Sequence, residues 1–280
     1  AEESFARLTK GVLNFINEHH FKTFLLVIRS AGFISPDMIR SQYTLNFAYI
    51  LFLKLREQKI HPEIIARTVR RWFVYSILTQ RYSGSPESTI DFDIRQISER
   101  SAADYLAEKE EGELSDAFWN AALVQNLDTS VISSPYMNVF LAAQVKARDM
   151  GFLSKDVTVS DLITIKGDIH HLFPKDYLKK NGFQRWKYNQ IANFVYMQTE
   201  INIEVGSRSP KDYFDIIRRQ IFRGEFRFGA FTTEEQLHKN LEMNCIPDTI
   251  LAAEADRYET FLLERRRMMA RKIEQYYKSL

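Results

Sequence analysis

Residues 167–174 read Gly-Asp-Ile-His-His-Leu-Phe-Pro, and they lie where the helical periodicity of the chain gives way to another pattern. Aliphatic and β-branched residues are interleaved with Asp, Thr and Ser over residues 157–165, and a second β-prone run covers residues 193–198. Runs of this kind predict two short strands. We therefore expect a small mixed element here, in which a strand ends in His170-His171.

Helical periodicity dominates the remainder of the chain. Prolines after Ser or His mark helix starts near residues 36, 62 and 135, and further helices are expected over residues 211–223 and 248–277. Apolar residues recur at helical spacing in three early groups: Phe5, Leu8, Val12, Phe15 and Ile16; Leu45, Tyr49, Phe52, Leu53 and Leu55; and Ile64, Ile65, Val69, Phe73, Ile77 and Leu78.

The expected fold class is therefore α+β and predominantly α-helical. The change of character near Gly151 predicts a helical domain at residues 1–150 and a second domain at residues 151–280, which contains the mixed element and flanking C-terminal helices.

Composition excludes several classes of protein. Hydrophobic residues make up 45% and charged residues 26%, which is typical of a globular chain. The longest uncharged run, residues 129–145, holds Ser, Pro, Asn and Gln, so no membrane span is expected. The single Cys245 and the absence of a signal-peptide pattern favour the reducing cytoplasm. Because the sequence begins at Ala1 rather than Met, we expect a piece of a longer protein.

Two adjacent histidine pairs occur among only six histidines. His19-His20 has no polar motif downstream, so we interpret that pair as structural or surface residues. His170-His171 differs, because Asn193 follows His171 by 22 residues and Asn202 follows nine residues later. A strand ending in two histidines, a loop, a second strand and a helix that offers a carbonyl oxygen suit one hard divalent cation beside a general base. Taken singly, each of these residues is explained as well by a buried histidine or a turn asparagine.

The sequence segments around these residues resemble the HNH, or His-Me finger, nuclease motif, and specifically the C-terminal nuclease domain of GmrSD-type (type IV) restriction endonucleases. The matching words are His170-His171-Leu172-Phe173-Pro174-Lys175, Asn189-Gln190-Ile191-Ala192-Asn193-Phe194, Asn202-Ile203 and Ser209-Pro210-Lys211-Asp212-Tyr213-Phe214. A weaker similarity upstream covers residues 70–73 and 81–85, and the Asp-Gly-Gln-Gln-Arg word of the family's N-terminal NTPase and sensor domain is absent. The resemblance thus implies that an NTPase half lies elsewhere.

The resemblance implies a role for each matching residue. His171 is the general base, His170 and Asn202 are ligands of a divalent metal, Mg²⁺ or Mn²⁺, and Asn193 sets the loop around the base. Many family members carry Asp or Glu in place of His170, which leaves the preferred metal open. Asp168 is two residues before His170 and is a further candidate ligand or orienting residue.

The implied function is metal-dependent hydrolysis of phosphodiester bonds in foreign DNA, including phage DNA with modified bases, as part of a restriction and antiviral defence system. A catalytically silent DNA-binding or partner-docking module is the competing hypothesis, because fold does not guarantee activity. Cleavage of RNA is a third. The sequence contains no Gly-rich phosphate loop, so this chain is not expected to hydrolyse nucleotides itself.

Basic residues near the motif are candidates for phosphate contacts, namely Lys175, Arg208, Lys211, Arg218 and Arg219. The charge is modestly asymmetric, with 20 Lys and Arg against 16 Asp and Glu from Lys166 onward. A second basic cluster, Arg265-Arg266-Arg267 with Arg271-Lys272, fits DNA binding and an ordinary solvated helix face equally well. We also expect Trp72, Trp119 and Trp186 in the core, and Arg81 and Tyr82 as weaker nucleic-acid candidates.

Overall fold

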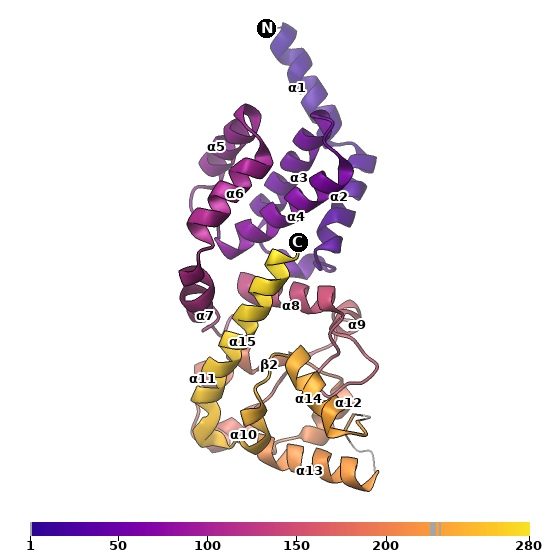
Figure 1. Cartoon of the computed structure of the whole chain (residues 1–280), viewed down its shortest axis with the longest axis vertical. Coiled ribbons are helices and arrows are strands. Elements are labelled where there is room, and N and C mark those ends of the chain that lie inside the picture. Colours follow the sequence, from indigo (N-terminus) through magenta and orange to yellow (C-terminus); the bar gives the residue numbers. More distant parts are fainter. Residues whose placement is uncertain (1, 225–227, 230) are drawn as a thin grey trace. The chain divides into compact units, whose positions relative to one another are not determined.

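The computed structural model describes residues 2–224, 228, 229 and 231–280, and these residues are predominantly helical (Figure 1). The chain forms two compact units. The first contains the residues up to Ser115 together with Tyr277–Leu280, and the second contains Asp116–Tyr276. The boundary suggested from the sequence, between residues 150 and 151, lies inside the second unit.

The first unit is built from helices, with α3 and α4 packed against each other at its centre. Several helices start at a side chain that accepts a backbone N–H, as Ser41 does from Thr44 and Ser101 does from Asp104. The elements are α1 (Glu2–Phe15), α2 (Glu18–Ser30), η1 (Pro36–Met38), α3 (Gln42–Glu57), α4 (Pro62–Leu78), α5 (Pro86–Glu99) and α6 (Ala102–Glu113). Pro36 therefore opens a short 3₁₀ turn, and the helix that the sequence predicts after it begins at Gln42.

A buried carboxylate organises the first unit. Asp93 is fully buried and accepts two hydrogen bonds from the Arg81 guanidinium, at 2.8 and 2.5 Å, and one from the Tyr82 hydroxyl, at 2.8 Å. Tyr105 donates to the same carboxylate at 2.7 Å. Tyr82 is buried and the Arg81 guanidinium is engaged by Asp93, so the structure commits both residues to an internal network rather than to a nucleic-acid contact.

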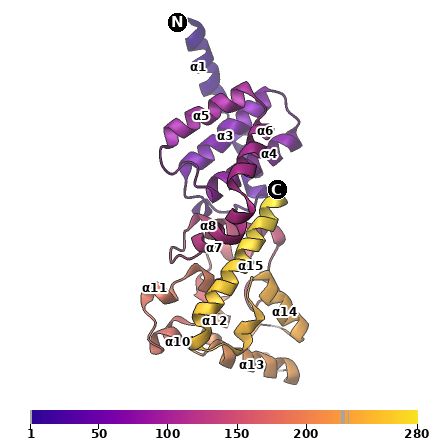
Figure 2. The same cartoon turned by 60° about the vertical axis from the view of Figure 1, so that its left-hand side comes forward.

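The second unit contains both strands of the described chain. Its elements are η2 (Phe118–Ala122), α7 (Leu123–Asn126), α8 (Pro135–Ala147), α9 (Val159–Thr164), β1 (Ile169–His171), α10 (Lys175–Lys180), α11 (Arg185–Tyr188), η3 (Ile191–Asn193), β2 (Phe194–Tyr196), α12 (Thr199–Val205), α13 (Pro210–Arg223), α14 (Glu234–Met243), η4 (Asp248–Ala252), η5 (Ala255–Arg257) and α15 (Tyr258–Lys278), whose last residues belong to the first unit. Figures 1 and 2 both show α10 and α13 at the same end of this unit.

Residues 157–165 do not form the expected strand. Thr158 accepts the N–H of Asp161 while the Asp161 carboxylate accepts the N–H of Thr158, and this capping box starts α9. The buried residues Val159, Leu162 and Ile163 then follow helical spacing. The local cap and the three-and-four spacing outweigh the strand preference of the β-branched residues.

The expected strand at residues 193–198 is confirmed in its centre. β2 pairs antiparallel with β1, so that His171 lies opposite Phe194 and His170 lies opposite Val195. The helix α12 follows β2 after a two-residue connection. The order of elements around the histidines is therefore strand, connection, strand and helix, as the sequence predicts.

The outer edge of β2 is closed by a buried arginine on α15. Arg265 donates to the carbonyl oxygens of Ala192 at 2.9 Å, Phe194 at 2.8 Å and Asn244 at 3.2 Å. On the other edge, Leu172 donates to the Asn193 carbonyl, so the carbonyls of residues 192 and 194 point away from β1. Arg265 thus supplies donors that a third strand would otherwise provide.

The rest of the basic cluster on α15 is also largely engaged. Arg266 pairs with Asp128 and Lys272 pairs with Asp149, both at 2.5 Å. Arg265, Arg266 and Lys272 are therefore engaged within the unit, and Arg267 and Arg271 are the exposed cations of this cluster.

Two further expectations are corrected. The terminal helix begins at Tyr258 rather than Asp248, because Ala253 and Glu254 are extended, and the Ala253 carbonyl accepts a hydrogen bond from the N–H of Lys211. Trp72 and Trp119 are buried as expected, but Trp186 is 58% exposed. Within the described residues, no helix is both long enough and apolar enough to cross a bilayer.

Candidate functional site

His171 lies at the end of β1 with its ring among aromatic side chains. The ring centroid is 5.0 Å from that of Phe194 and 6.4 Å from that of Tyr188, and both contacts are edge-to-face. Residues 171 and 194 form a pair that shares no backbone hydrogen bonds, which is the closer kind of antiparallel pair. The strand register therefore holds the imidazole ring against the ring of Phe194.

A side-chain amide sets the protonation of this ring. The Nε2 atom of His171 lies 3.0 Å from Oδ1 of Asn189, and an amide oxygen only accepts hydrogen bonds. The neutral imidazole therefore carries its proton on Nε2, and Nδ1 keeps a lone pair. Burial lowers the pKa of His171, Asn189 opposes that effect, and the positive charge of Lys175 lowers the pKa further. The ring is thus held as a neutral base at neutral pH.

His170 has a different environment from its neighbour. Its side chain is 9% exposed, and its Nε2 atom is buried without a hydrogen-bond partner among the described residues. Adjacent residues of a strand project to opposite faces, so His170 lies on the face that carries Val195. Burial lowers the pKa of His170, and the exposed carboxylate of Asp168 opposes this. A buried imidazole nitrogen without a partner is a potential metal ligand.

Asn193 ties the connection between the strands to β2. The side chain is fully buried; its Oδ1 accepts the N–H of Phe173 at 2.8 Å, and its Nδ2 donates to the carbonyls of Phe173 at 3.2 Å and Tyr188 at 3.0 Å. One amide thereby binds both ends of the segment that carries α10 and α11. These hydrogen bonds are those of a residue that sets loop geometry, which is the role that the resemblance implies for Asn193.

Asn202 lies in the middle of α12 and is partly buried. Its side chain has no hydrogen-bond partner among the described residues, so its carbonyl oxygen is available to a ligand. No group of three or more His, Cys, Asp and Glu residues in the described part of the chain is placed to hold a metal ion. A cation at this site would therefore take few protein ligands, as hard cations that retain several waters do.

The basic residues expected to bind DNA have varied surroundings. Lys175 begins α10, is exposed, and acts electrostatically on His171. Arg208 donates to the carbonyls of Glu204 and Val205 and so closes the end of α12. Of the others, Lys211 pairs with Glu254, Arg218 lies 3.6 Å from Glu234, and Arg219 is exposed with its Nε on the carbonyl of Asp215. Lys175 is thus the member of this set that the structure connects with His171.

Sequence reasoning assigned no role to Asn189, although it lies within a quoted motif word. Nothing in the residue type distinguishes it from the many asparagines that form turns. The available signal was its position at the end of the connection that follows Lys175, because a residue there returns to β2. The contact with His171 depends on how the connection folds back.

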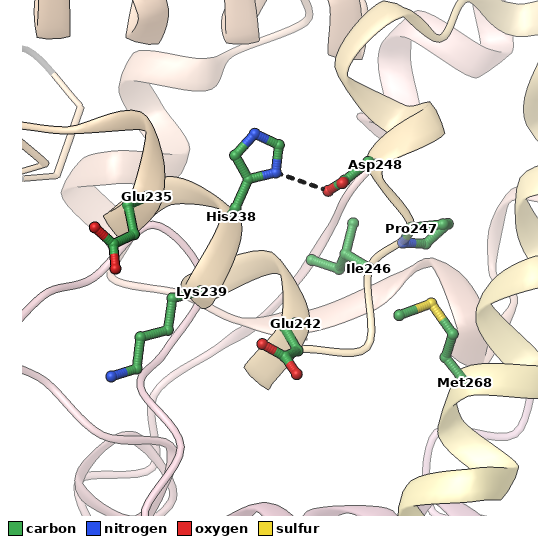
Figure 3. Close-up of a pocket in the computed structure, with 8 residues that line it drawn as sticks. All are labelled: Glu235, His238, Lys239, Glu242, Ile246, Pro247, Asp248 and Met268. Carbon is green, nitrogen blue, oxygen red and sulfur yellow. Dashed lines mark hydrogen bonds and ion pairs between the residues drawn. The ribbon is translucent and has the colours of Figure 1, made fainter.

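A separate cavity of about 570 Å³ opens on α14 (Figure 3). Neither His170 nor His171 lines it. It is lined by Glu235, His238, Lys239, Glu242, Ile246, Pro247, Asp248 and Met268. His238 and Asp248 form its one polar pair among the residues drawn, with Nδ1 3.0 Å from Oδ1. None of the residues singled out from the sequence lines this cavity.

In the role that the resemblance implies for His171, replacing Asn189 by alanine is expected to lower kcat for DNA cleavage about 10-fold to 100-fold, the usual cost of losing a partner that orients a reactive group. The substrate KM stays unchanged, because the amide faces the imidazole rather than the substrate. Steady-state cleavage of a short labelled duplex measures both constants. Asn181→Ala is the matched control, since Asn181 is an exposed asparagine that bonds to the carbonyl of Tyr177. A kcat that Asn189→Ala leaves intact contradicts this role.

Comparison with known proteins finds little similarity. No family model matches the chain, and no solved structure matches it. An uncharacterised protein of the archaeon Methanocaldococcus jannaschii is 27% identical over 146 residues, which is 52% of this chain and 24% of that protein. The chain therefore spans about a quarter of the length of this relative.

Proposed function

We propose that this chain is a metal-dependent endonuclease of the His-Me finger type, in which His171 is the general base that activates water for hydrolysis of a DNA phosphodiester bond. The observation that carries the proposal is the hydrogen bond between His171 and Asn189. It leaves Nδ1 unprotonated on a ring that burial and Lys175 keep neutral. An imidazole in this state can accept a proton from water.

The types of donor suit a divalent cation. The unpartnered Nε2 of His170 and the free amide oxygen of Asn202 would hold it, with Asp168 as a further candidate ligand. When bound, Mg²⁺ or Mn²⁺ supplies positive charge that stabilises the phosphate and the leaving oxygen.

The chain's own residues perform the remaining tasks. His171 takes a proton from water at Nδ1, and the resulting hydroxide attacks phosphorus in line with the leaving 3′ oxygen. Asn189 holds the imidazole, which becomes positively charged in that step. Asn193 keeps the connection closed, so that Lys175 stays near the reacting phosphate.

The biological role that fits this proposal is restriction of foreign DNA in the cytoplasm, with sensing by an NTPase half. The GmrSD-type resemblance supports this role, as do the matching words around His171, Asn193 and Asn202.

A catalytically silent DNA-binding or docking module is the second candidate. The observation that favours it is the burial of His170, because a side chain that is 9% exposed gives an ion little access. His170 also lies on the opposite face of β1 from His171. In this alternative the histidines are structural.

Supercoiled plasmid incubated with the chain in Mg²⁺, Mn²⁺ or EDTA separates the two functions. We expect nicked and linear products in Mg²⁺ or Mn²⁺, and none in EDTA. DNA binding without cleavage in any metal would favour the silent module, and cleavage of a labelled RNA alone would move the substrate to RNA. A chain that neither binds nor cuts DNA contradicts the nuclease and the DNA-binding form of the silent module.

A further inference from the structure

Trp186 is a large aromatic side chain presented to solvent in a fixed position. It is 58% exposed, whereas Trp72 and Trp119 are at most 4% exposed. Its indole N–H donates to Oε1 of Gln184 at 2.9 Å, and the ammonium of Lys187 lies 4.8 Å from its ring centroid. Hydrogen bonding and a cation–π contact therefore hold the ring on one side and leave its remaining surface uncovered.

The stretch of chain that carries this ring is rich in cations. Residues 175–188, named here the basic segment, contain five Lys and Arg residues and the single acidic residue Asp176. Two of the lysines are paired, Lys179 with Asp176 and Lys187 with Glu259. Among the described residues no ion pair engages the other three, which are exposed: Lys175, Lys180 and Arg185. The basic segment thus keeps positive charge for an anionic partner.

The basic segment is continuous with the candidate site. Tyr188, its last residue, contacts the ring of His171, and Lys179 lies 5.9 Å from the centroid of the Tyr188 ring. Tyr258 on α15 fixes the end of the segment by donating to the carbonyl of Lys187 at 2.9 Å. A polymer that follows the basic segment therefore leads to His171.

We propose that the basic segment binds a nucleic-acid strand in which at least one base is unstacked, with that base on the open face of Trp186 and the backbone phosphates on Lys180 and Arg185. An aromatic platform combined with a positively charged track is the arrangement that binds single strands, because every base has a π face and the phosphates are spaced along the track. A fully paired duplex keeps its bases stacked on one another and offers the ring none. This inference deepens the proposed function and specifies DNA that is single-stranded or locally opened near the cut.

Binding to a single-stranded thymidine 20-mer tests the proposal in EDTA, where no cleavage is expected. Trp186→Ala is expected to weaken this binding about 5-fold to 100-fold, as removal of a stacking aromatic does, while Trp186→Phe retains most of the affinity. Phe222→Ala is the matched control, because Phe222 is a 92% exposed aromatic residue on α13 and outside the basic segment. Arg185→Glu is expected to reduce the salt dependence of binding by about one phosphate contact.

Fluorescence gives a second readout without mutation. Trp186 is the exposed tryptophan, so iodide quenches its emission, and bound oligonucleotide is expected to protect it. The proposal is overturned if Trp186→Ala binds the single strand as well as the unchanged chain does, if a matched duplex binds equally tightly through Trp186, or if poly-glutamate protects the ring equally.

The outcomes separate this proposal from the nuclease assignment. If the chain cleaves plasmid with metal and Trp186→Ala has no effect on binding, the strand-binding proposal is contradicted and the nuclease proposal stands. If the chain binds single strands through Trp186 but cleaves DNA in no metal, the strand-binding proposal is supported and the nuclease proposal is contradicted.

Discussion

His171→Ala is expected to lower the rate of metal-dependent plasmid cleavage about 10²-fold to 10⁴-fold, the usual contribution of a general base. The imidazole is replaced by a methyl group, which accepts no proton, and Asn189 loses its partner. Initial rates of nicking at saturating Mg²⁺ or Mn²⁺, at one pH near neutrality, measure the effect. DNA affinity in EDTA is expected to stay the same, because the base does not hold the phosphate backbone.

His238→Ala is the control for this prediction. His238 lies in the same unit, is partly exposed, and bonds to Asp248 in a cavity that the proposed reaction does not use (Figure 3). Its removal is expected to leave the cleavage rate within about twofold, since substitutions of exposed residues away from structural features have small effects. Full cleavage by His171→Ala would show that this ring is not the base.

Arg265→Met is expected to destabilise the second unit by about 3 kcal/mol. The substitution leaves the carbonyls of Ala192, Phe194 and Asn244 buried without their donor, and each buried unpaired polar group costs about 1–3 kcal/mol. Part of this cost is offset, because methionine removes a charge that is itself expensive to bury. The cost of burying this charge is reflected in the guanidinium, because burial lowers the pKa of Arg265 to about 10.

Cys245 provides the readout for this second prediction. It is the single cysteine, it is 4% exposed, and burial raises the pKa of its thiol to about 11, so it reacts slowly with thiol reagents until the unit opens. We expect Arg265→Met to expose the thiol at a lower urea concentration than the unchanged chain. Arg267→Met, two residues along α15 and exposed, is the control and should shift stability by no more than about 0.5 kcal/mol. Equal urea midpoints for the two variants would refute the role of Arg265.

Loss of Arg265 is also expected to affect the candidate base. The arginine holds the carbonyl of Phe194, whose ring packs against His171, and the carbonyl of Ala192, next to Asn193. A variant that remains folded at low temperature should therefore cleave DNA more slowly than Arg267→Met under the same conditions.

Several elements could be predicted from the sequence because their causes are local. Pro62, Pro135 and Pro210 start helices at the first helical position, where the missing N–H costs nothing, and the apolar spacing that follows selects the buried face. The strand at Phe194–Tyr196 was likewise evident from its composition. α9 was missed although its cause is also local, because β-branched residues at helical spacing satisfy both patterns over so short a run.

The candidate site divides in the same way. The sequence alone pointed to His170, His171, Asn193 and Asn202 by residue type, order and resemblance, and it placed the histidines at a strand end. Only the tertiary structure decided that Asn189 bonds to His171, that Arg265 is buried against β2, and that Trp186 is exposed. The physical reason is range. Caps, turns and periodicity act over about four residues. Arg265, in contrast, donates to the carbonyl of Ala192 across 73 residues of chain. Only the packing of distant segments determines which side chains are buried, paired or left in water.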